Sequence, residues 1–192
     1  MTHVSKGMKT VILIRHAKSN WKKPYRNDFQ RGLNKRGKKE SRALGEWIED
    51  GCLWPDLTYC SKARRAEETY MNISETFSKD MKVEYRHDLY HTDPSKILDI
   101  IQNAPEEHSR LALIGHDTWM SELARSLCSK STRDVLENIK GFPTSAFAEY
   151  QFDTKKWKKV KNGRGSCVLS ITGKSLLKKS KRNYDGWRVR LN

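Results

Sequence analysis

Short apolar runs alternate with longer amphipathic stretches along most of the chain. Residues 10–16 (TVILIRH) form a short, β-branched, apolar run, which predicts a buried strand. Residues 35–51 instead place apolar side chains such as Leu44 and Ile48 at helical spacing, and Gly51 is the expected end of that helix. The first third of the chain therefore predicts a strand followed by a helix that covers it.

The same alternation continues toward the C-terminus. Further strands are expected at residues 55–61, 82–85, 110–117 and 145–152, with weaker candidates at 157–160 and 167–172. Helices are expected at residues 62–79, 93–104 and 118–130, and the last fifteen or so residues are expected to be irregular. Strands and helices that alternate this regularly predict a three-layer α/β/α sandwich with a mainly parallel central sheet.

Length and composition narrow the class of protein. A chain of 192 residues can bury one sizeable core, so a single domain is expected. The chain has no apolar run near the roughly 20 residues of a membrane helix, and its start (MTHVSKGMKT) lacks the apolar core of a signal peptide. An intracellular, cytoplasmic protein is expected. The four cysteines show no CxxC spacing and are expected to be reduced thiols.

Most of the net charge lies at the C-terminal end. The formal charge is +15, and residues 155–192 hold thirteen Lys or Arg against one acid, Asp185. Such a segment raises the local concentration of anions and could contact RNA, an acidic protein or an anionic membrane. The stretch KKWKKVKNGRG also interleaves Trp157 with lysines, as some single-strand binders do. A solvated basic face is the simpler alternative.

Basic side chains stand where the predicted strands end. Arg15 and His16 follow the first strand, and the adjacent Arg64 and Arg65 follow the second. His116 follows the fourth strand. Because ligands of parallel α/β sheets bind beyond the carboxyl ends of the strands, these side chains are expected to meet in one crevice.

Two histidines and two or three arginines suit a phosphoryl group. Arginine presents a planar fork that matches phosphate oxygens, and a neutral imidazole can attack phosphorus while a second stabilises charge. A metal site is less expected, because the six histidines show no HExxH or HxH spacing and no carboxylate cluster accompanies them. No cofactor is therefore predicted.

Several motifs carry a family resemblance. LIRHAKSNW (13–21) resembles the RHG motif of the histidine phosphatase (phosphoglycerate mutase-like) superfamily, and RHAKS..W resembles its SixA-like phosphohistidine phosphatase branch. NDFQRGLNKRG (27–37), CSKARRAEET (60–69), LALIGHD and FPTSAF (142–147) are similar to later motifs of that branch. The resemblance covers about residues 8–153 and implies a phosphoglycerate mutase-like fold.

The resemblance also implies roles for individual residues. It makes His16 the nucleophile that becomes phosphorylated, with Arg15, Arg65 and His116 completing the phosphate pocket. Arg65 lies four residues before the motif's threonine, whereas Arg64 falls at a variable position and is expected to be an exposed neighbour.

Further positions are implied less directly. Ser19 matches a residue near the substrate phosphate, and Lys18 is expected to line the entrance. Many relatives carry a glutamate general acid after the third strand, where this chain has His91, with Asp88 close by. Asp117, directly after His116, is the remaining candidate for the acid. Since a protonated imidazole leaves phosphorus without further help, the missing glutamate is compatible with phosphohistidine hydrolysis.

The resulting prediction is a metal-independent phosphatase that acts through a phosphohistidine intermediate on phosphohistidine protein or a small phosphoester. The alternative is a catalytically inactive relative that binds RNA or an acidic partner through its basic C-terminal segment. Residues 1–154 are expected to form the histidine phosphatase domain, with residues 155–192 as a basic extension packed on or trailing from it. The sequence does not determine the oligomeric state.

Overall fold

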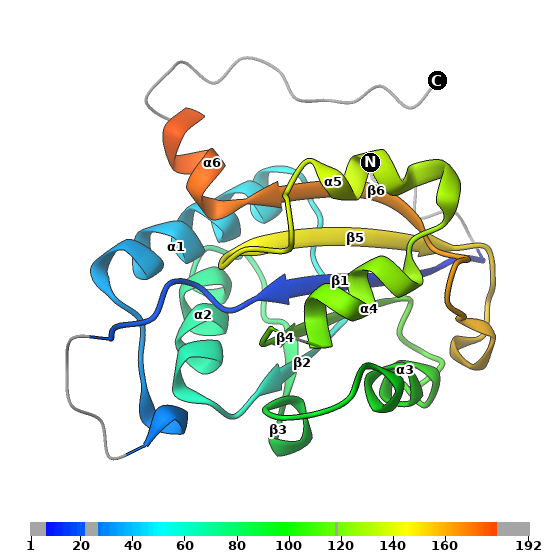
Figure 1. Ribbon diagram of the computed structural model, residues 1–192, viewed down its shortest axis with the longest axis horizontal. Helices are drawn as coiled ribbons and strands as arrows, with labels where there is room; N and C mark the ends of the chain where they lie inside the picture. The colour runs from blue at the N-terminus through cyan, green and yellow to red at the C-terminus, as the bar shows by residue number, and fades with distance from the viewer. Residues whose placement is uncertain (1–6, 22–26, 118, 180–192) are drawn as a thin grey trace.

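A six-stranded sheet forms the centre of the computed structural model, which describes residues 7–21, 27–117 and 119–179 (Figure 1). The spatial order of the strands is β3-β2-β4-β1-β5-β6. Their bounds are Lys9–Arg15 (β1), Leu57–Ser61 (β2), Lys82–Arg86 (β3), Arg110–Gly115 (β4), Ala146–Phe152 (β5) and Ser166–Thr172 (β6). Strands β1 to β4 are mutually parallel, while β5 runs antiparallel to β1 and β6 antiparallel to β5. The predicted mainly parallel sheet is confirmed.

Helices cover both faces of this sheet, as the sequence predicts. One face carries α1 (Lys35–Asp50), α2 (Arg64–Ser74) and α6 (Gly173–Lys179). The other face carries α3 (Pro94–Gln102), α4 (Trp119–Leu127) and α5 (Arg133–Glu137). Short 3₁₀ turns lie at Asp28–Gln30 (η1), His87–Leu89 (η2), Lys130–Thr132 (η3) and Trp157–Lys159 (η4). Among the described residues, no helix has the length and apolar character needed to cross a bilayer.

The central strand β1 separates two apolar cores. Its side chains alternate between the faces, so Val11 and Leu13 join the core under α3, α4 and α5, whereas Ile12 and Ile14 join the core under α1, α2 and α6. All four are at most 3% exposed. The run TVILI is continuously apolar because a parallel strand covered on both faces buries every side chain.

Helix α2 ends earlier than its periodicity predicts. The apolar spacing runs through Phe77, but the helix stops at Ser74. The carbonyl of Ile73, which would accept the Phe77 N–H in a continuing helix, accepts the Thr76 hydroxyl (2.7 Å) and the Thr76 N–H (3.1 Å) instead. Phe77 still packs on the apolar core from the turn that follows the helix. Its spacing from Ile73 therefore looks helical in the sequence although the helix has already ended.

The strand predicted at 157–160 is wrong. These residues form η4, and Trp157 is fully buried, its indole N–H donating to the carbonyls of Pro105 (3.2 Å) and His108 (2.9 Å). A tryptophan held in this way cannot stack on a nucleic acid base, so the interleaving of Trp157 with lysines is no sign of single-strand binding. The strand predicted at 167–172 is confirmed as β6.

Helix α6 was not predicted, and it places Gly173 to Lys179 against α1. The expected irregular end of the chain lies outside the described residues beyond position 179. All four cysteines fall in the described part of the chain and none forms a disulfide, as predicted.

The parallel strands point the same way. The arrowheads of β1, β2 and β4 meet at the end of the sheet where α1 and α2 begin, while the turn η4, drawn in orange, lies at the opposite end (Figure 1). Any side chains that follow these three strands are therefore gathered at one edge of the sheet.

Candidate active site

His16 and His116 face each other at the carboxyl ends of β1 and β4. The N–H of His16 donates to the Gly115 carbonyl (2.9 Å), which extends the pairing of β1 with β4 by one residue. The two rings lie 5.1 Å apart between centroids, and both side chains are buried. Parallel pairing of two neighbouring strands thus brings together residues one hundred positions apart in the chain.

The hydrogen bonds of His16 expose one particular nitrogen. Its Nδ1 lies 2.8 Å from the Ala17 carbonyl, which can only accept, so the ring proton resides on Nδ1. Nε2 therefore carries the lone pair, which accepts a hydrogen bond from the Arg65 Nε–H (3.2 Å). Burial, together with the nearby arginine charges, lowers the pKa of His16 to about 3. A neutral ring with an available Nε2 is the nucleophilic form of histidine.

His116 contacts Ser61 through one of its two ring nitrogens. The Ser61 hydroxyl accepts the Ala63 N–H (3.3 Å) and lies 2.9 Å from His116 Nε2. His116 Nδ1 is buried, and no described residue forms a hydrogen bond with it. Burial lowers the pKa of His116 to about 2, with the neighbouring His16 acting in the same direction.

Arg65 projects from the first turn of α2 toward His16. Its Nη1 donates to the Asp28 carbonyl (2.8 Å), and its Nη2 lies 3.0 Å from the Asp28 carboxylate. The Thr69 hydroxyl donates to the Arg65 carbonyl (2.6 Å) and accepts the Ala17 N–H (2.9 Å), which ties α2 to the loop after His16. The adjacent Arg64 points into solvent and pairs with Glu68 (2.7 Å), in agreement with its expected exposure.

Arg15 is held by two segments, the residues before β5 and the residue after His116. Its Nη1 donates to the Phe142 carbonyl (2.9 Å) and lies 3.1 Å from the Asp117 carboxylate. Its Nε is buried and has no hydrogen-bond partner in the described part of the chain. Arg15 Nε and His116 Nδ1 are thus two buried nitrogens without partners among these residues, whereas buried polar atoms in native proteins are usually paired.

A carboxylate that sequence reasoning missed organises the arginines. Asp28 in η1 accepts from Arg31 Nε (2.9 Å), from Arg31 Nη2 (2.7 Å) and from the Tyr90 hydroxyl (2.8 Å). Partial burial raises the pKa of Asp28, but the bonds from Arg31 and Tyr90 outweigh it and lower that pKa to about 2. Asp28 is thus an anion that fixes Arg65, and it heads the stretch DFQRGLN that carried part of the family resemblance.

The weaker sequence candidates lie at the rim or elsewhere. Ser19 is buried, and its hydroxyl accepts from Arg31. The Lys18 side chain is exposed and contacts no site residue among those described. Of the candidate acids, Asp117 pairs with Arg15 and Ser121, and Asp88 pairs with Arg86 (2.7 Å).

His91 is exposed, and its ring lies 4.0 Å from the ring of Tyr90. Tyr90 in turn stands 5.3 Å from His116, and burial and the charge of His91 are among the influences that lower the pKa of His116. Tyr90 is a second residue that the sequence analysis did not single out.

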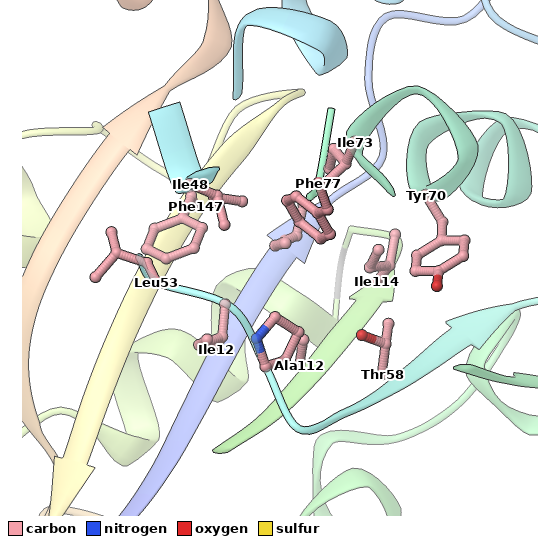
Figure 2. A pocket seen from close by; sticks show the side chains of 12 residues that line it. Ile12, Ile48, Leu53, Thr58, Tyr70, Ile73, Phe77, Ala112, Ile114 and Phe147 are labelled. Atoms are coloured by element: carbon pink, nitrogen blue, oxygen red, sulfur yellow. The ribbon is translucent and has the colours of Figure 1, made fainter. Parts of the chain in front are cut away.

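An apolar cavity between the sheet and helices α1 and α2 is a different feature. Ile12, Ile48, Tyr70 and Ile114 are among its lining side chains, and they converge from strands and helices of that face (Figure 2). The lining offers no cation for a phosphoryl group, and all of its residues except Pro55 and Thr58 belong to the core already described. Among the residues that the structure describes, no group of three or more His, Cys, Asp or Glu is placed to hold a metal ion.

Comparison with known proteins agrees with this geometry. The family model described as "Histidine phosphatase superfamily (branch 1)" matches residues 11–99. An uncharacterized protein of Mycobacterium tuberculosis is 30% identical over 158 residues, which are 81% of this chain and 96% of that protein. The chain belongs to the histidine phosphatase superfamily.

Solved structures place the chain beside one branch of that superfamily. A SixA protein of Agrobacterium tumefaciens, described as a phosphohistidine phosphatase, has a TM-score of 0.69 and 26% identity over 85% of this chain and 97% of that one. A SixA protein of Nakamurella multipartitia, described in the same way, has a TM-score of 0.73 and 24% identity over 86% of this chain and 96% of that one. The histidine phosphatase is therefore SixA-like, and its superfamily supports a hydrolase that removes phosphoryl groups.

Proposed function

We propose that this protein is a metal-independent phosphatase that forms a phosphohistidine on His16, with phosphohistidine in proteins as its substrate class. One observation carries the proposal. His16 Nε2 accepts from the Arg65 guanidinium, the His116 ring lies 5.1 Å from the His16 ring, and Arg15 Nε and His116 Nδ1 are buried without partners among the described residues. A phosphoryl group bound there would meet a nucleophile on phosphorus and donors on its oxygens.

The buried donors explain how the protein would stabilise the transferring group. Charge spreads over the equatorial oxygens in phosphoryl transfer, so catalysis depends on positioned cations and N–H groups. Arg15, Arg65 and His116 are fixed by contacts with Phe142, Asp28 and Ser61 respectively. Preorganised donors of this kind lower the barrier because they need no rearrangement during the reaction.

In the first step, the Nε2 lone pair of neutral His16 attacks phosphorus. The new P–N bond forms as the bond to the substrate imidazole breaks. The leaving imidazole keeps that electron pair and departs neutral, because its other nitrogen is already protonated. Arg65 must first release Nε2, since its Nε–H now occupies that lone pair at 3.2 Å. The oxygens of the phosphoryl group supply the new acceptor for the guanidinium.

In the second step, water attacks the phosphorus of phospho-His16. The P–N bond breaks, its electrons return to Nε2, and both water protons leave with the product as dihydrogen phosphate. His16 keeps its Nδ1 proton on the Ala17 carbonyl throughout. Neither step needs a strong general acid, which fits the exposed position of His91 and the pairing of Asp88 and Asp117 with arginines.

A small phosphoester is the second candidate substrate, because the same donors would hold any phosphoryl group. An alcohol leaving group would need a proton, and His91, Asp88 or Asp117 would have to provide it. The SixA-like character of the chain favours phosphohistidine. The alternative function, RNA binding by an inactive relative, is weakened because Trp157 is buried and cannot stack on a base.

The test is hydrolysis of a phosphohistidine peptide and of an aryl phosphate by wild type and His16→Ala, both in excess EDTA. The proposal predicts turnover of the peptide by wild type and none by His16→Ala, with thermal melting showing that the variant is folded. Turnover by His16→Ala would contradict the nucleophile, and loss of wild-type activity in EDTA that a divalent metal restores would contradict metal independence. If wild type hydrolyses the aryl phosphate but not the peptide, the substrate class is a phosphoester and not phosphohistidine.

A further inference from the structure

Three lysines on α1 form an exposed, unpaired basic surface. Lys35, Lys38 and Lys39, hereafter the lysine face, are all exposed, and none forms a salt bridge with a described residue. The other basic residues of α1 do have partners, since Arg36 pairs with Glu40 (2.7 Å) and Arg42 with Glu46 (3.3 Å). The lysine face therefore presents three positive charges that the protein itself does not neutralise.

The lysine face lies beside the candidate active site. The N–H of Asn34, the N-cap of α1, donates to the Lys18 carbonyl (3.0 Å), and its side chain donates to the Ser19 carbonyl (3.2 Å). Gly37 approaches the Lys18 backbone so closely that a Cβ there would collide with the Lys18 carbonyl. The first turn of α1 is thus locked to the residues that directly follow His16.

The spacing of these lysines suits a large partner. Residues three and four positions apart share one side of a helix, so Lys35, Lys38 and Lys39 point outward together. They do not converge on the phosphoryl group, which Arg15, Arg65 and His116 already surround. A small substrate held at His16 would leave them unused, whereas the surface of a protein would extend over the start of α1.

We infer that the lysine face docks an acidic surface of the protein that presents its phosphohistidine to His16. The inference rests on the proposed function and specifies the partner that this function requires. Exposed lysines next to a reaction centre attract an acidic surface through their field and orient its approach, mainly by raising the association rate. Each contact is weak alone, because exposed ion pairs are screened by water and salt.

The chain offers a matched control at the opposite end of the sheet. Lys155, Lys158 and Lys159 are exposed around the buried Trp157 and, like the lysine face, form no salt bridge with a described residue. Replacing either set of three lysines by glutamine removes the same net charge. Glutamine also has about the helix propensity of lysine, so α1 should be preserved in Lys35→Gln/Lys38→Gln/Lys39→Gln.

The experiment compares wild type and both triple variants on three substrates. Two are synthetic phosphohistidine peptides that differ only in flanking residues, one rich in glutamate and the other in neutral serine and glutamine. The third is an aryl phosphate. We expect the lysine-face variant to lose about tenfold in kcat/KM for the acidic peptide alone, through KM, with kcat unchanged. Wild type should lose the same preference as salt rises, and the control variant should behave as wild type.

The outcomes separate the inference from the proposed function. If wild type hydrolyses both peptides equally well, or if both triple variants lose activity on the acidic peptide alike, the proposed function stands and the docking surface is wrong. If wild type hydrolyses the aryl phosphate but neither peptide, phosphohistidine is not the substrate class and the docking inference fails with it.

Discussion

The two ends of the sheet bury the same kinds of polar group but satisfy them differently. At the end where β1 begins, Lys9 is 3% exposed, and its Nζ donates to the carbonyls of Glu106 (2.9 Å) and His108 (2.7 Å) and lies 3.2 Å from the Glu106 carboxylate. At the end where β1 stops, Arg15 Nε and His116 Nδ1 are buried, and none of the residues that the structure describes forms a hydrogen bond with them. A buried cation that is fully paired serves the fold, while donors kept unpaired are available to a ligand.

This difference explains why the two ends should respond differently to mutation. Substitutions at the beginning of β1 should lower the free energy of unfolding. They should leave the kcat/KM of the folded protein unchanged. Substitutions at the carboxyl ends should reduce catalysis more than stability, because the proposed function uses the side chains there to bind the phosphoryl group. The following predictions test that separation, from the largest expected effect to the smallest.

Arg65→Ala should reduce kcat/KM by about 10²- to 10³-fold, because it removes the guanidinium nearest His16 Nε2. Arg64→Ala is the matched control, since its side chain is exposed and pairs only with Glu68, and it should stay within about twofold of wild type. Steady-state kinetics on the phosphohistidine peptide measure both. Equal losses in the two variants would mean that the charge of α2 matters rather than the position of Arg65.

Lys9→Met should lower the free energy of unfolding by about 2–3 kcal/mol, because the Glu106 carbonyl loses this donor and the His108 carbonyl keeps only the Trp157 indole N–H. Urea unfolding measures the loss. The kcat/KM value, corrected for the folded fraction, should not change. A catalytic defect in this variant without loss of stability would contradict the division between the two ends.

The buried histidines should make stability depend on pH. The folded-state pKa values of His16 and His116 lie far below the unfolded value of about 6.5, so the unfolded chain binds protons that the folded protein excludes. The stability contributed by the two neutral histidines is therefore complete above pH 6.5 and falls as the pH drops toward 3, the folded-state pKa of His16. His16→Asn should make this decline shallower by about 1.4 kcal/mol per pH unit, as measured by urea unfolding at several pH values. An unchanged slope would show that His16 is not neutral in the fold.

Tyr90→Phe should reduce kcat about fivefold, because Asp28 loses one of its hydrogen bonds and holds Arg65 less firmly. The melting temperature should change little, since Asp28 keeps both bonds from Arg31. A change in KM alone, with kcat unchanged, would instead place Tyr90 in substrate binding.

The spacing of apolar residues correctly predicted the strands and helices in which that spacing alone decides which side chains are buried. The strand TVILI, the helix that begins at Lys35 and the strand that ends at Gly115 all have apolar spacing that their packing requires. The pattern failed where a side-chain hydrogen bond decided the backbone, as with Thr76 at the end of α2 and Trp157 in η4. The spacing of apolar residues records neither the hydroxyl of Thr76, which bonds three residues back, nor the partner of Trp157, which lies 49 residues away in the chain.

The candidate site divides in the same way. His16, Arg15 and His116 were predicted to meet because they follow strands of a parallel sheet, and the structure brings them together. Asp28 and Tyr90 come from a 3₁₀ turn and the residue after another, where no strand end marks them. Their role depends on the hydrogen bond from the Tyr90 hydroxyl to the Asp28 carboxylate, which joins residues 62 positions apart in the chain.

The most direct test of the central claim is to trap the covalent intermediate. The protein is mixed with a phosphohistidine peptide labelled on phosphorus, quenched within milliseconds in alkali, which preserves P–N bonds, and mapped by mass spectrometry. The proposed mechanism predicts transient label on His16 alone in wild type, and no label on the protein in His16→Ala. Label on another residue, or product release by wild type at full rate with no phosphorylated protein at any time, would contradict it.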